Sequence, residues 1–436
     1  MKIFSKALWV VAAISSVALA ACSGGGGGNN SQGGNSIGWN ATPDWIDKPG
    51  GSGSSGGNPD PATPSGDKNN TVAIRVDNSM GTINMLSATI TVCVPGTQGA
   101  SQCTTIDRML VDTGSVGVRV MASAMPTLSS RLLTQVGAVD DASGTAPIAE
   151  CMPFGSGTTW GSVKRADVTI GSRTASNIPI QLIGDGAYTI PSDCVAHGGP
   201  DLSTVERLGA NGILGIGYGT RDSKDALTTA LPGNYYYCTG ANACFNTRML
   251  ATKEVMNPVA AFPSDNNGTI IRLPKLPVGG QTSVVGELTF GIGTQSNNAL
   301  PSNVNVLALD EYGEFTTQYQ GQVLSWSALD SGTNAFAFQD DSIPTTSSWY
   351  TPSTALNLAA TMEATNGKGT PVNAPFTIDN AARVWANGNA AYDNVGWYQS
   401  SSKMFLWGLP FFYGRSVYTT VGNGTIGKQS GPFVAF

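Results

Sequence analysis

The sequence predicts an all-β fold with minor helices, arranged as two lobes around a central cleft. Of the 436 residues, 55 are glycine and 24 are proline, while only 12% are charged. Such a composition suits a turn-rich β protein better than a helical bundle. Short stretches of alternating apolar and polar residues recur from about residue 71 onwards, as is typical of strands. A short motif centred on an aspartate also occurs twice, far apart in the chain, and this duplication predicts two similar lobes.

The first 22 residues have the features of an export signal. Two lysines precede an apolar stretch over residues 7–21 that is too short for a comfortable membrane span. The stretch ends in Leu-Ala-Ala-Cys22, which resembles a bacterial lipobox and implies cleavage before Cys22 and acylation of that cysteine. Multiple acyl chains anchor a protein stably, and Ser23 after the cysteine implies the outer membrane. An ordinary signal peptide with an incidental cysteine is the alternative, and the side of the membrane that the chain faces is left open.

Residues 23–70 consist mainly of Gly, Ser, Asn and Pro, with few apolar side chains. A segment of this composition cannot bury enough apolar surface to order itself, so we expect a flexible tether. Residues 53–57 formally match the serine-hydrolase pattern G-x-S-x-G, but the required flanking strand and helix are missing, and we interpret the match as chance. After the tether we expect an N-terminal lobe over residues 71–250 and a C-terminal lobe over residues 251–436.

Period-two patterns with β-branched residues predict strands in several places. Clear examples are residues 71–76, 88–92 and 166–170. Asn266-Asn267-Gly268 is a hairpin signal and predicts a turn before a strand that starts at Thr269. Short helices are expected near residues 122–135 and 247–256.

Apart from Cys22, the chain has six cysteines, and an even number in an exported protein indicates disulfides. They are Cys93, Cys103, Cys151, Cys194, Cys238 and Cys244. The sequence leaves their connectivity open. Closeness in sequence favours Cys93–Cys103 and Cys238–Cys244, which would leave Cys151 to pair with Cys194.

Composition also excludes some functions. The net charge is −6 and there is no basic run, so nothing supports nucleic-acid binding through phosphate contacts. The single histidine, His197, excludes a multi-histidine metal site, and we expect no metal and no other cofactor. Apolar residues make up 41% of the chain, which allows a sizeable core.

The duplicated motif spans residues 109–115 (MLVDTGS) and 327–333 (SALDSGT). In each copy an apolar run predicts a buried strand that carries Asp112 or Asp330 to the centre of the molecule. Glycine permits a sharp turn and close approach of two backbones, and the hydroxyl groups can donate hydrogen bonds to the carboxylates. Two carboxylates held together share a proton, so one can act as a base on water while the other acts as an acid. The predicted supporting residues are Thr113, Gly114, Ser115, Ser331, Gly332 and Thr333.

The paired motifs resemble the signature of pepsin-like aspartic peptidases, and they look like those of an uncharacterised family of proteobacterial lipoproteins. Ile213-Leu214-Gly215 and Leu406-Trp407-Gly408 resemble the apolar-apolar-Gly element that follows each aspartate in the peptidases, and residues 154–161 resemble their flap hairpin. The resemblance covers about residues 71–436. It implies a bilobal acid-protease architecture and an endopeptidase that hydrolyses peptide bonds without metal or covalent intermediate. The implied partners are a peptide or protein substrate in the cleft and the membrane, and we expect a monomer.

Two departures from that family affect substrate binding. Phe154 stands where the flap of the peptidases usually carries Tyr, so Phe154 and Gly155 are candidates for contacts with substrate. Arg119 stands where those enzymes usually have Trp. It could bind an acidic group in the cleft, or lower the pKa of a dyad carboxyl. Since fold does not imply function, a cell-envelope protein that binds a peptide or glycan without cutting it is the alternative to an enzyme, and a purely structural lipoprotein is a weaker third.

Overall fold

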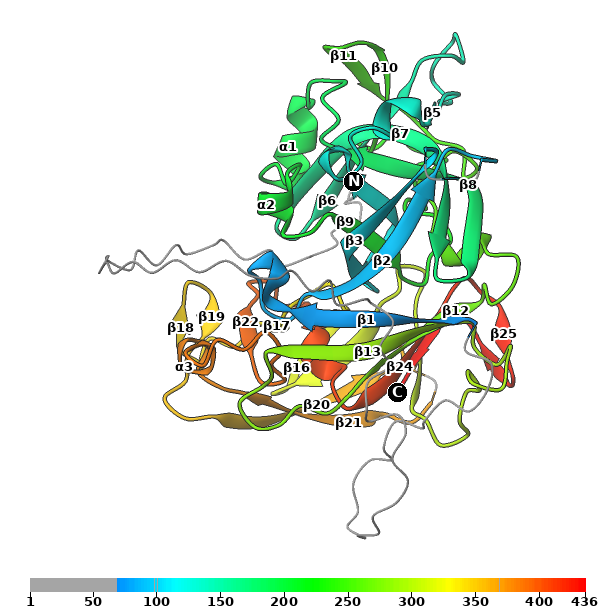
Figure 1. Ribbon diagram of the computed structural model, residues 1–436. Coiled ribbons are helices and arrows are strands. Elements are labelled where there is room, and N and C mark those ends of the chain that lie inside the picture. The colour runs from blue at the N-terminus through cyan, green and yellow to red at the C-terminus, as the bar shows by residue number, and fades with distance from the viewer. Residues whose placement is uncertain (1–68, 98, 100, 368) are drawn as a thin grey trace, which may run out of the picture.

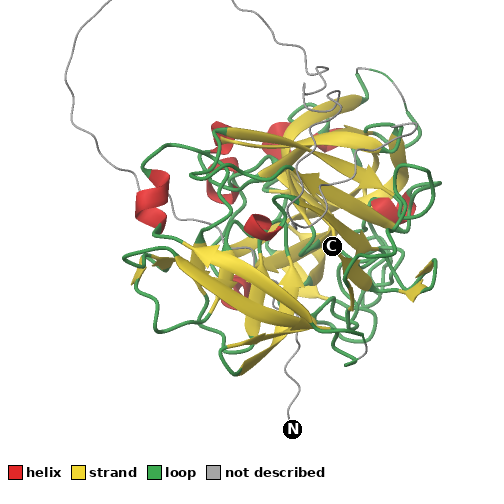
Figure 2. Ribbon diagram, turned by 90° about the horizontal axis from the view of Figure 1, so that it is seen from below, coloured by secondary structure: helices red, strands yellow, loops and turns green. Residues whose placement is uncertain are grey.

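The computed structural model describes residues 69–97, 99, 101–367 and 369–436. These residues form mainly strands with a few short helices (Figure 2), which confirms the predicted fold class. The predicted signal segment, the lipidation site at Cys22 and nearly all of the tether lie outside the described residues. Placing the lobe boundary at residue 250 stays a prediction. Among the helices of the described chain, none has the length and apolar character needed to cross a membrane.

The upper lobe in Figure 1 is N-terminal and contains most of one large sheet. Its strands are β2 (Leu86–Cys93), β3 (Cys103–Asp112), β4 (Val116–Met121), β5 (Leu133–Thr134), β6 (Ile148–Phe154), β7 (Gly157–Ile170), β8 (Arg173–Ile183), β9 (Gly212–Ile216), β10 (Tyr235–Gly240) and β11 (Ala243–Asn246). The sheet runs in the order β11-β10-β6-β7-β8-β4-β9-β3-β2 and continues through β1 into the layer beneath the lobe.

That layer joins the two halves of the chain (Figure 1). It contains β1 (Thr71–Asp77), β13 (Ser283–Phe290), β12 (Gly268–Leu273), β24 (Arg415–Thr420), β27 (Phe433–Ala435) and β14 (Val306–Ala308) in this order. Strand β1 pairs along its whole length with β13. It therefore connects the N-terminus of the described chain to strands from the C-terminal half.

The lower lobe is built on a second sheet, in the order β18-β19-β22-β17-β23-β16-β15-β20-β21. Its strands are β15 (Phe315–Tyr319), β16 (Gln322–Leu329), β17 (Phe336–Phe338), β18 (Thr345–Thr346), β19 (Trp349–Tyr350), β20 (Leu356–Glu363), β21 (Val372–Ile378), β22 (Gly396–Tyr398) and β23 (Met404–Trp407). A separate ribbon pairs β25 (Thr425–Ile426) with β26 (Gln429–Ser430). Stacked and edge-to-face aromatic rings fill the core of this lobe, with Phe338, Phe405 and Trp407 at its centre.

The two lobes repeat one strand plan. In the upper lobe β9 lies between β3 and β4, parallel to the first and antiparallel to the second. In the lower lobe β23 lies in the same way between β16 and β17. A fourth strand, β8 or β22, then pairs in parallel with β4 or β17. Because the matching strands flank the two copies of the sequence motif, the plan confirms the predicted bilobal, pepsin-like architecture.

Helices in the described residues are short. They are α1 (Ser192–Gly198), α2 (Val205–Leu208) and α3 (Ala381–Trp385), with 3-10 turns at Asn78–Met80, Ala122–Ala124, Ser129–Arg131, Val259–Ala261 and Leu409–Phe411. The prediction of a helix over residues 122–135 was wrong, because Pro126 separates two single turns and Leu133 then enters β5. A helix over residues 247–256 is also absent from the described structure, where this segment forms turns.

The strand predictions over residues 71–76, 88–92 and 166–170 are confirmed by β1, β2 and β7. The strand predicted from Thr269 is confirmed by β12, but the hairpin predicted at residues 266–268 was wrong. Strand β12 pairs with β13 and β24, both of which follow it in the chain. The two asparagines instead use their side-chain amides to hold the turn, with donation to the carbonyl oxygens of Phe262 and Ile292.

Three disulfides form in the described residues, with the pairing that closeness in sequence favoured. They are Cys93–Cys103, Cys151–Cys194 and Cys238–Cys244. The first and third join residues directly opposite each other in antiparallel pairs, and the second ties α1 to β6. All three therefore brace the upper lobe.

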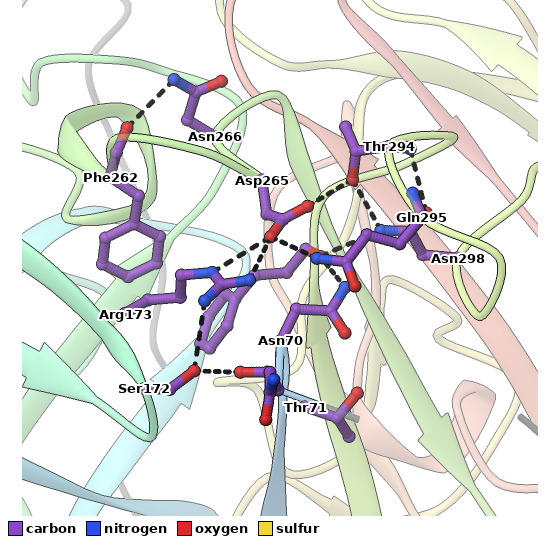
Figure 3. A network of polar contacts seen from close by, with 12 residues as sticks. Asn70, Thr71, Ser172, Arg173, Phe262, Asp265, Asn266, Thr294, Gln295 and Asn298 are labelled. Atoms are coloured by element: carbon purple, nitrogen blue, oxygen red, sulfur yellow. Dashed lines mark hydrogen bonds and ion pairs between the residues drawn. The ribbon is translucent and has the colours of Figure 1, made fainter. Parts of the chain in front are cut away.

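A buried polar network around Asp265 holds this lobe to the layer beneath it (Figure 3). The Asp265 carboxylate accepts hydrogen bonds from Arg173 Nη2 at 2.6 Å, Thr294 Oγ1 at 2.5 Å and Gln295 Nε2 at 2.7 Å. The side chain of Asp265 is 2% exposed and that of Arg173 is 16% exposed. Because Arg173 begins β8 whereas Thr294 and Gln295 follow β13, the contact connects elements of both halves of the chain.

We expect Asp265→Asn to destabilise the folded chain by about 2–4 kcal/mol, because it leaves a mostly buried guanidinium without its counter-charge. The free energy of unfolding in urea measures this. Arg207→Gln is the matched control, since its ion pair with Asp201 is exposed and should contribute far less. If the two variants lose the same free energy of unfolding, the network around Asp265 does not hold the two halves of the chain together.

Candidate active site

Asp112 and Asp330 lie at equivalent places in the two lobes. Asp112 is the last residue of β3 and stands opposite Gly215 of β9. Asp330 directly follows β16, and its backbone N–H donates to the carbonyl oxygen of Trp407 at 3.0 Å. Strands β4, β9 and β23 are buried along their whole length. Near-continuous apolar runs are typical of strands covered on both faces, and here such strands position the aspartates in the interior.

Each carboxylate is held by its own turn in the same way. Gly114 N–H donates to Asp112 Oδ1 at 2.8 Å, and Ser115 Oγ donates to Oδ2 at 2.5 Å. In the second copy Gly332 N–H donates to Asp330 Oδ1 at 2.8 Å and Thr333 Oγ1 donates to Oδ2 at 2.6 Å. The two backbone N–H and hydroxyl pairs thus fix the orientation of both carboxyl groups.

The middle hydroxyl of each motif crosses to the other lobe. Thr113 Oγ1 donates to the carbonyl oxygen of Leu329 at 2.9 Å and accepts from the N–H of Ser331 at 3.0 Å. Ser331 Oγ donates to the carbonyl oxygen of Val111 at 2.8 Å and accepts from the N–H of Thr113 at 3.1 Å. These four reciprocal bonds are buried and lock the two turns together.

The motif glycines allow the opposing carboxyl groups to meet. A Cβ on Gly114 would lie 2.5 Å from Asp330 Cγ, and one on Gly332 would lie 2.6 Å from Asp112 Oδ1. Since real Cβ atoms do not approach so closely, any side chain at either glycine would push the facing carboxyl away. The Asp112 and Asp330 carboxyl groups are thus close enough for each to affect the pKa of the other.

The two apolar-apolar-Gly elements close the turns from behind. A Cβ on Gly215 would lie 2.8 Å from the carbonyl oxygen of Gly117, and one on Gly408 would lie 2.1 Å from that of Ala335. Backbone therefore packs on backbone at both places, which is why glycine is required there.

Burial controls the protonation of the pair. Loss of water contact raises the pKa of Asp112, while the bonds from Ser115 and Gly114 oppose this rise. Burial and then the negative charge of Asp112 raise the pKa of Asp330 well above its ordinary value. Two carboxyl groups held this close disfavour the doubly ionised state, and their titration belongs to the pair rather than to either residue.

The predicted flap residues form a hairpin of β6 and β7, which closes with Phe154 opposite Gly157. The Phe154 ring is buried and packs in a small apolar cluster with Met152 and Leu202, so its contact with a substrate stays a prediction. A pocket lies beside the dyad between this hairpin and the loop that follows β9. Its lining includes Ser115, Met152, Pro153, Tyr218, Asp222 and Tyr312.

A larger depression, of about 1050 Å³, lies along the faces of β1, β2 and β3. Neither this depression nor the pocket at Ser115 is lined by an aspartate of the dyad. The pocket is the one relevant to the candidate site, because its lining residue Ser115 donates directly to Asp112.

Arg119 is fully buried, which overturns the expectation that it binds an acidic group in the cleft. Its guanidinium is occupied by two internal carboxyl groups, those of Glu150 and Asp222, each at 2.7 Å. The second expectation agrees with the structure, because the charge of Arg119 lowers the pKa of Asp112, although less than the hydrogen bonds to that carboxyl do.

Sequence reasoning missed Glu150 and Asp222. Glu150 lies within the apolar stretch Ile148–Phe154, and a charged residue inside a buried strand is a signal that could have identified it. Asp222 lies in a polar loop and gives no such signal. Within the described residues, no group of three or more His, Cys, Asp or Glu side chains is placed to hold a metal ion.

Comparisons with known proteins give a family and one solved fold. A protein-family model described as "Protein of unknown function (DUF3443)" matches residues 66–436. No curated protein matches the chain. Among solved structures, the chain is similar to an aspartic proteinase from Irpex lacteus, with a TM-score of 0.42 and 15% sequence identity over 84% of this chain and 96% of that one.

Proposed function

The chain belongs to the family described as proteins of unknown function (DUF3443), and we propose that it is an aspartic endopeptidase. In this proposal Asp112 and Asp330 activate a water molecule that hydrolyses a peptide bond. The observation that carries the proposal is that two matching turns hold two buried carboxyl groups close enough to affect each other's pKa.

The protonation of the pair supplies both catalytic roles. Ionised Asp112 accepts a proton from the water as its oxygen attacks the carbonyl carbon of the peptide. Protonated Asp330 gives its proton to the carbonyl oxygen, so a neutral tetrahedral diol forms. Asp112 then gives its proton to the departing nitrogen, while Asp330 takes one back from the diol as the C–N bond breaks. Both carboxyl groups return to their starting state.

A substrate needs a path to the pair, because Asp112 is fully buried and Asp330 is 3% exposed. The hairpin of β6 and β7 faces the pocket at Ser115 through Met152 and Pro153. We propose that the tip of this hairpin, at Phe154 and Gly155, moves to admit an extended peptide and then contacts it. Loops and hairpins over active sites commonly close on substrate in this way.

We also propose that the chain is exported, lipid-anchored through Cys22 to the outer membrane, and monomeric. The lipobox-like sequence and the tether support the anchor. The three disulfides support an oxidising compartment, since disulfides are rare in the cytosol.

The test is cleavage of a diverse peptide mixture by the full-length chain in detergent, from about pH 3 to pH 8. New peptide termini are identified by mass spectrometry, and the chain with both aspartates changed to asparagine is the control. We expect cleavage by the wild type alone. Cleavage by both chains would indicate a contaminating peptidase. A folded wild type that retains peptides without cutting them would favour the binding protein and overturn the proposal.

A further inference from the structure

A second buried charge cluster lies beside the dyad and consists of Arg119, Glu150 and Asp222. Arg119 Nη2 donates to Glu150 Oε1 and to Asp222 Oδ2, both at 2.7 Å. The three side chains are at most 1% exposed. Buried charges are rare unless they are paired. The chemistry of the dyad does not explain why these three charged residues are buried together.

The cluster joins three elements that surround the candidate site. Arg119 belongs to β4, which follows the Asp112 turn, and its Nη1 also donates to the carbonyl oxygen of Val116 at 2.6 Å. Glu150 belongs to β6, one strand of the flap hairpin. Asp222 belongs to the loop after β9 that lines the pocket with Ser115.

Further hydrogen bonds fix the two carboxyl-bearing elements. Tyr235 Oη donates to Asp222 Oδ1 at 2.7 Å and accepts from the N–H of Val255 at 2.7 Å. Gln181 Nε2 donates to the carbonyl oxygen of Glu150 at 2.9 Å. The guanidinium carbon of Arg119 also lies 5.9 Å from the centre of the Phe154 ring at the hairpin end. Arg119 therefore contacts the flap hairpin at two places, at Glu150 within β6 and at Phe154 at the end of β6.

The cluster has more acids than its arginine can balance. Besides Glu150 and Asp222, buried Glu254 faces it, and burial raises the pKa of Glu254 to about 8. Half-buried Arg221 is the other cation nearby, and Tyr235 faces the acids as a neutral phenol. Burial raises the pKa of Glu150 well above its ordinary value, and the neighbouring Asp222 carboxylate raises it further. Within the described residues, Arg119 is therefore the one cation to which both carboxyl groups are hydrogen-bonded.

We propose that Arg119 is a positioning residue that, through Glu150 and Asp222, holds the flap strand β6 and the loop after β9 at a fixed distance from the Asp112 turn. The pocket beside Ser115 is then formed before substrate binds. Preformed geometry of this kind raises the rate by orienting the reacting groups in advance. This role rests on the proposed peptidase activity of the dyad.

The test compares Arg119→Gln with the wild type in full-length chains. The readouts are hydrogen exchange of the β6 amides, the KM and kcat of peptide cleavage, and the pH profile. We expect exchange of β6 and KM each to rise on the order of tenfold, because the cation between the two elements is gone. The acid limb of the pH profile should move to higher pH, because the charge that lowers the pKa of Asp112 is lost. This shift reports the lost charge, whereas β6 exchange and KM report the lost positioning.

Arg272→Gln is the matched control, since Arg272 is also buried but bonds Thr289 and Asn297 in the layer beneath the lobe. It should leave β6 exchange unchanged. If Arg119→Gln does not fold, Arg119→Lys keeps the charge but not the forked geometry, and it should still raise β6 exchange. Unchanged β6 exchange in the folded Arg119 variant would overturn the proposal. Because exchange is measured without substrate, this failure is distinguishable from a wild type that does not cleave peptides.

Discussion

Asp330→Asn is expected to reduce peptide cleavage by at least about a thousandfold, because asparagine cannot give a proton to the scissile carbonyl oxygen. The same change is expected to make the folded chain more stable at neutral pH. The introduced asparagine side chain would have nearly the shape of protonated Asp330. Its oxygen could still accept from Gly332 N–H, and its NH2 group could donate to the Thr333 hydroxyl, which also accepts. The variant should therefore fold, and its two effects should be separable.

The gain in stability follows from the raised pKa of Asp330. The folded chain holds this proton more tightly than the unfolded chain, whose aspartates titrate near pH 4. The contribution of Asp330 to stability is therefore fully present below about pH 4 and is lost as the pH rises through the folded-state pKa. Asparagine does not titrate, so the variant escapes this loss.

Thermal unfolding of both chains from about pH 4 to pH 8 measures the effect. We expect the Tm of the variant to exceed that of the wild type by an amount that grows with pH. Asp112→Asn should also be inactive and should also relieve the repulsion, since the titration belongs to the pair. A Tm difference that does not change with pH would show that the two carboxyl groups are not coupled in the folded chain.

The dyad was predictable from the sequence because its chemistry imposes residue types locally. Asp112 and Asp330 each need a glycine and two hydroxyls within the same short turn, and the turn appears twice. The partners of Arg119 were not predictable in this way. Glu150 is separated from it by 31 positions and Asp222 by 103, so no local pattern records the contact.

The errors in the predicted strands and helices also arise because contacts between residues far apart in the sequence leave no local pattern. Asn267-Gly268 is a valid local turn signal. The strands that pair with β12 come later in the chain, and their pairing depends on tertiary packing rather than on the turn. Apolar spacing over residues 122–135 fits a helix, yet the segment is placed by β5 pairing with β7 and is interrupted by Pro126. Periodicity predicts which face of a segment is buried, but it does not predict which other segment packs against that face.

Gly114→Ala is expected to reduce cleavage by at least about a hundredfold, because the added methyl group would occupy the place of the Asp330 carboxyl. The methyl carbon would lie 2.5 Å from Asp330 Cγ and 2.7 Å from its Oδ1. Gly114 has no left-handed backbone conformation, so alanine is not strained there and the effect is steric. Displacing Asp330 would separate the two carboxyl groups and weaken the effect of each on the pKa of the other.

Gly332→Ala should act in the same way from the other side, since its Cβ would lie 2.6 Å from Asp112 Oδ1. Gly424→Ala is the matched control, because its Cβ would meet nothing within 4 Å and its backbone is likewise not left-handed. Cleavage rates and the pH profile measure all three. If Gly114→Ala and Gly332→Ala cleave as fast as Gly424→Ala, the carboxyl groups cannot be as close as the structure places them. If Gly114→Ala and Gly332→Ala lose cleavage and Gly424→Ala keeps it, peptide hydrolysis depends on the close approach of the two lobes at the dyad.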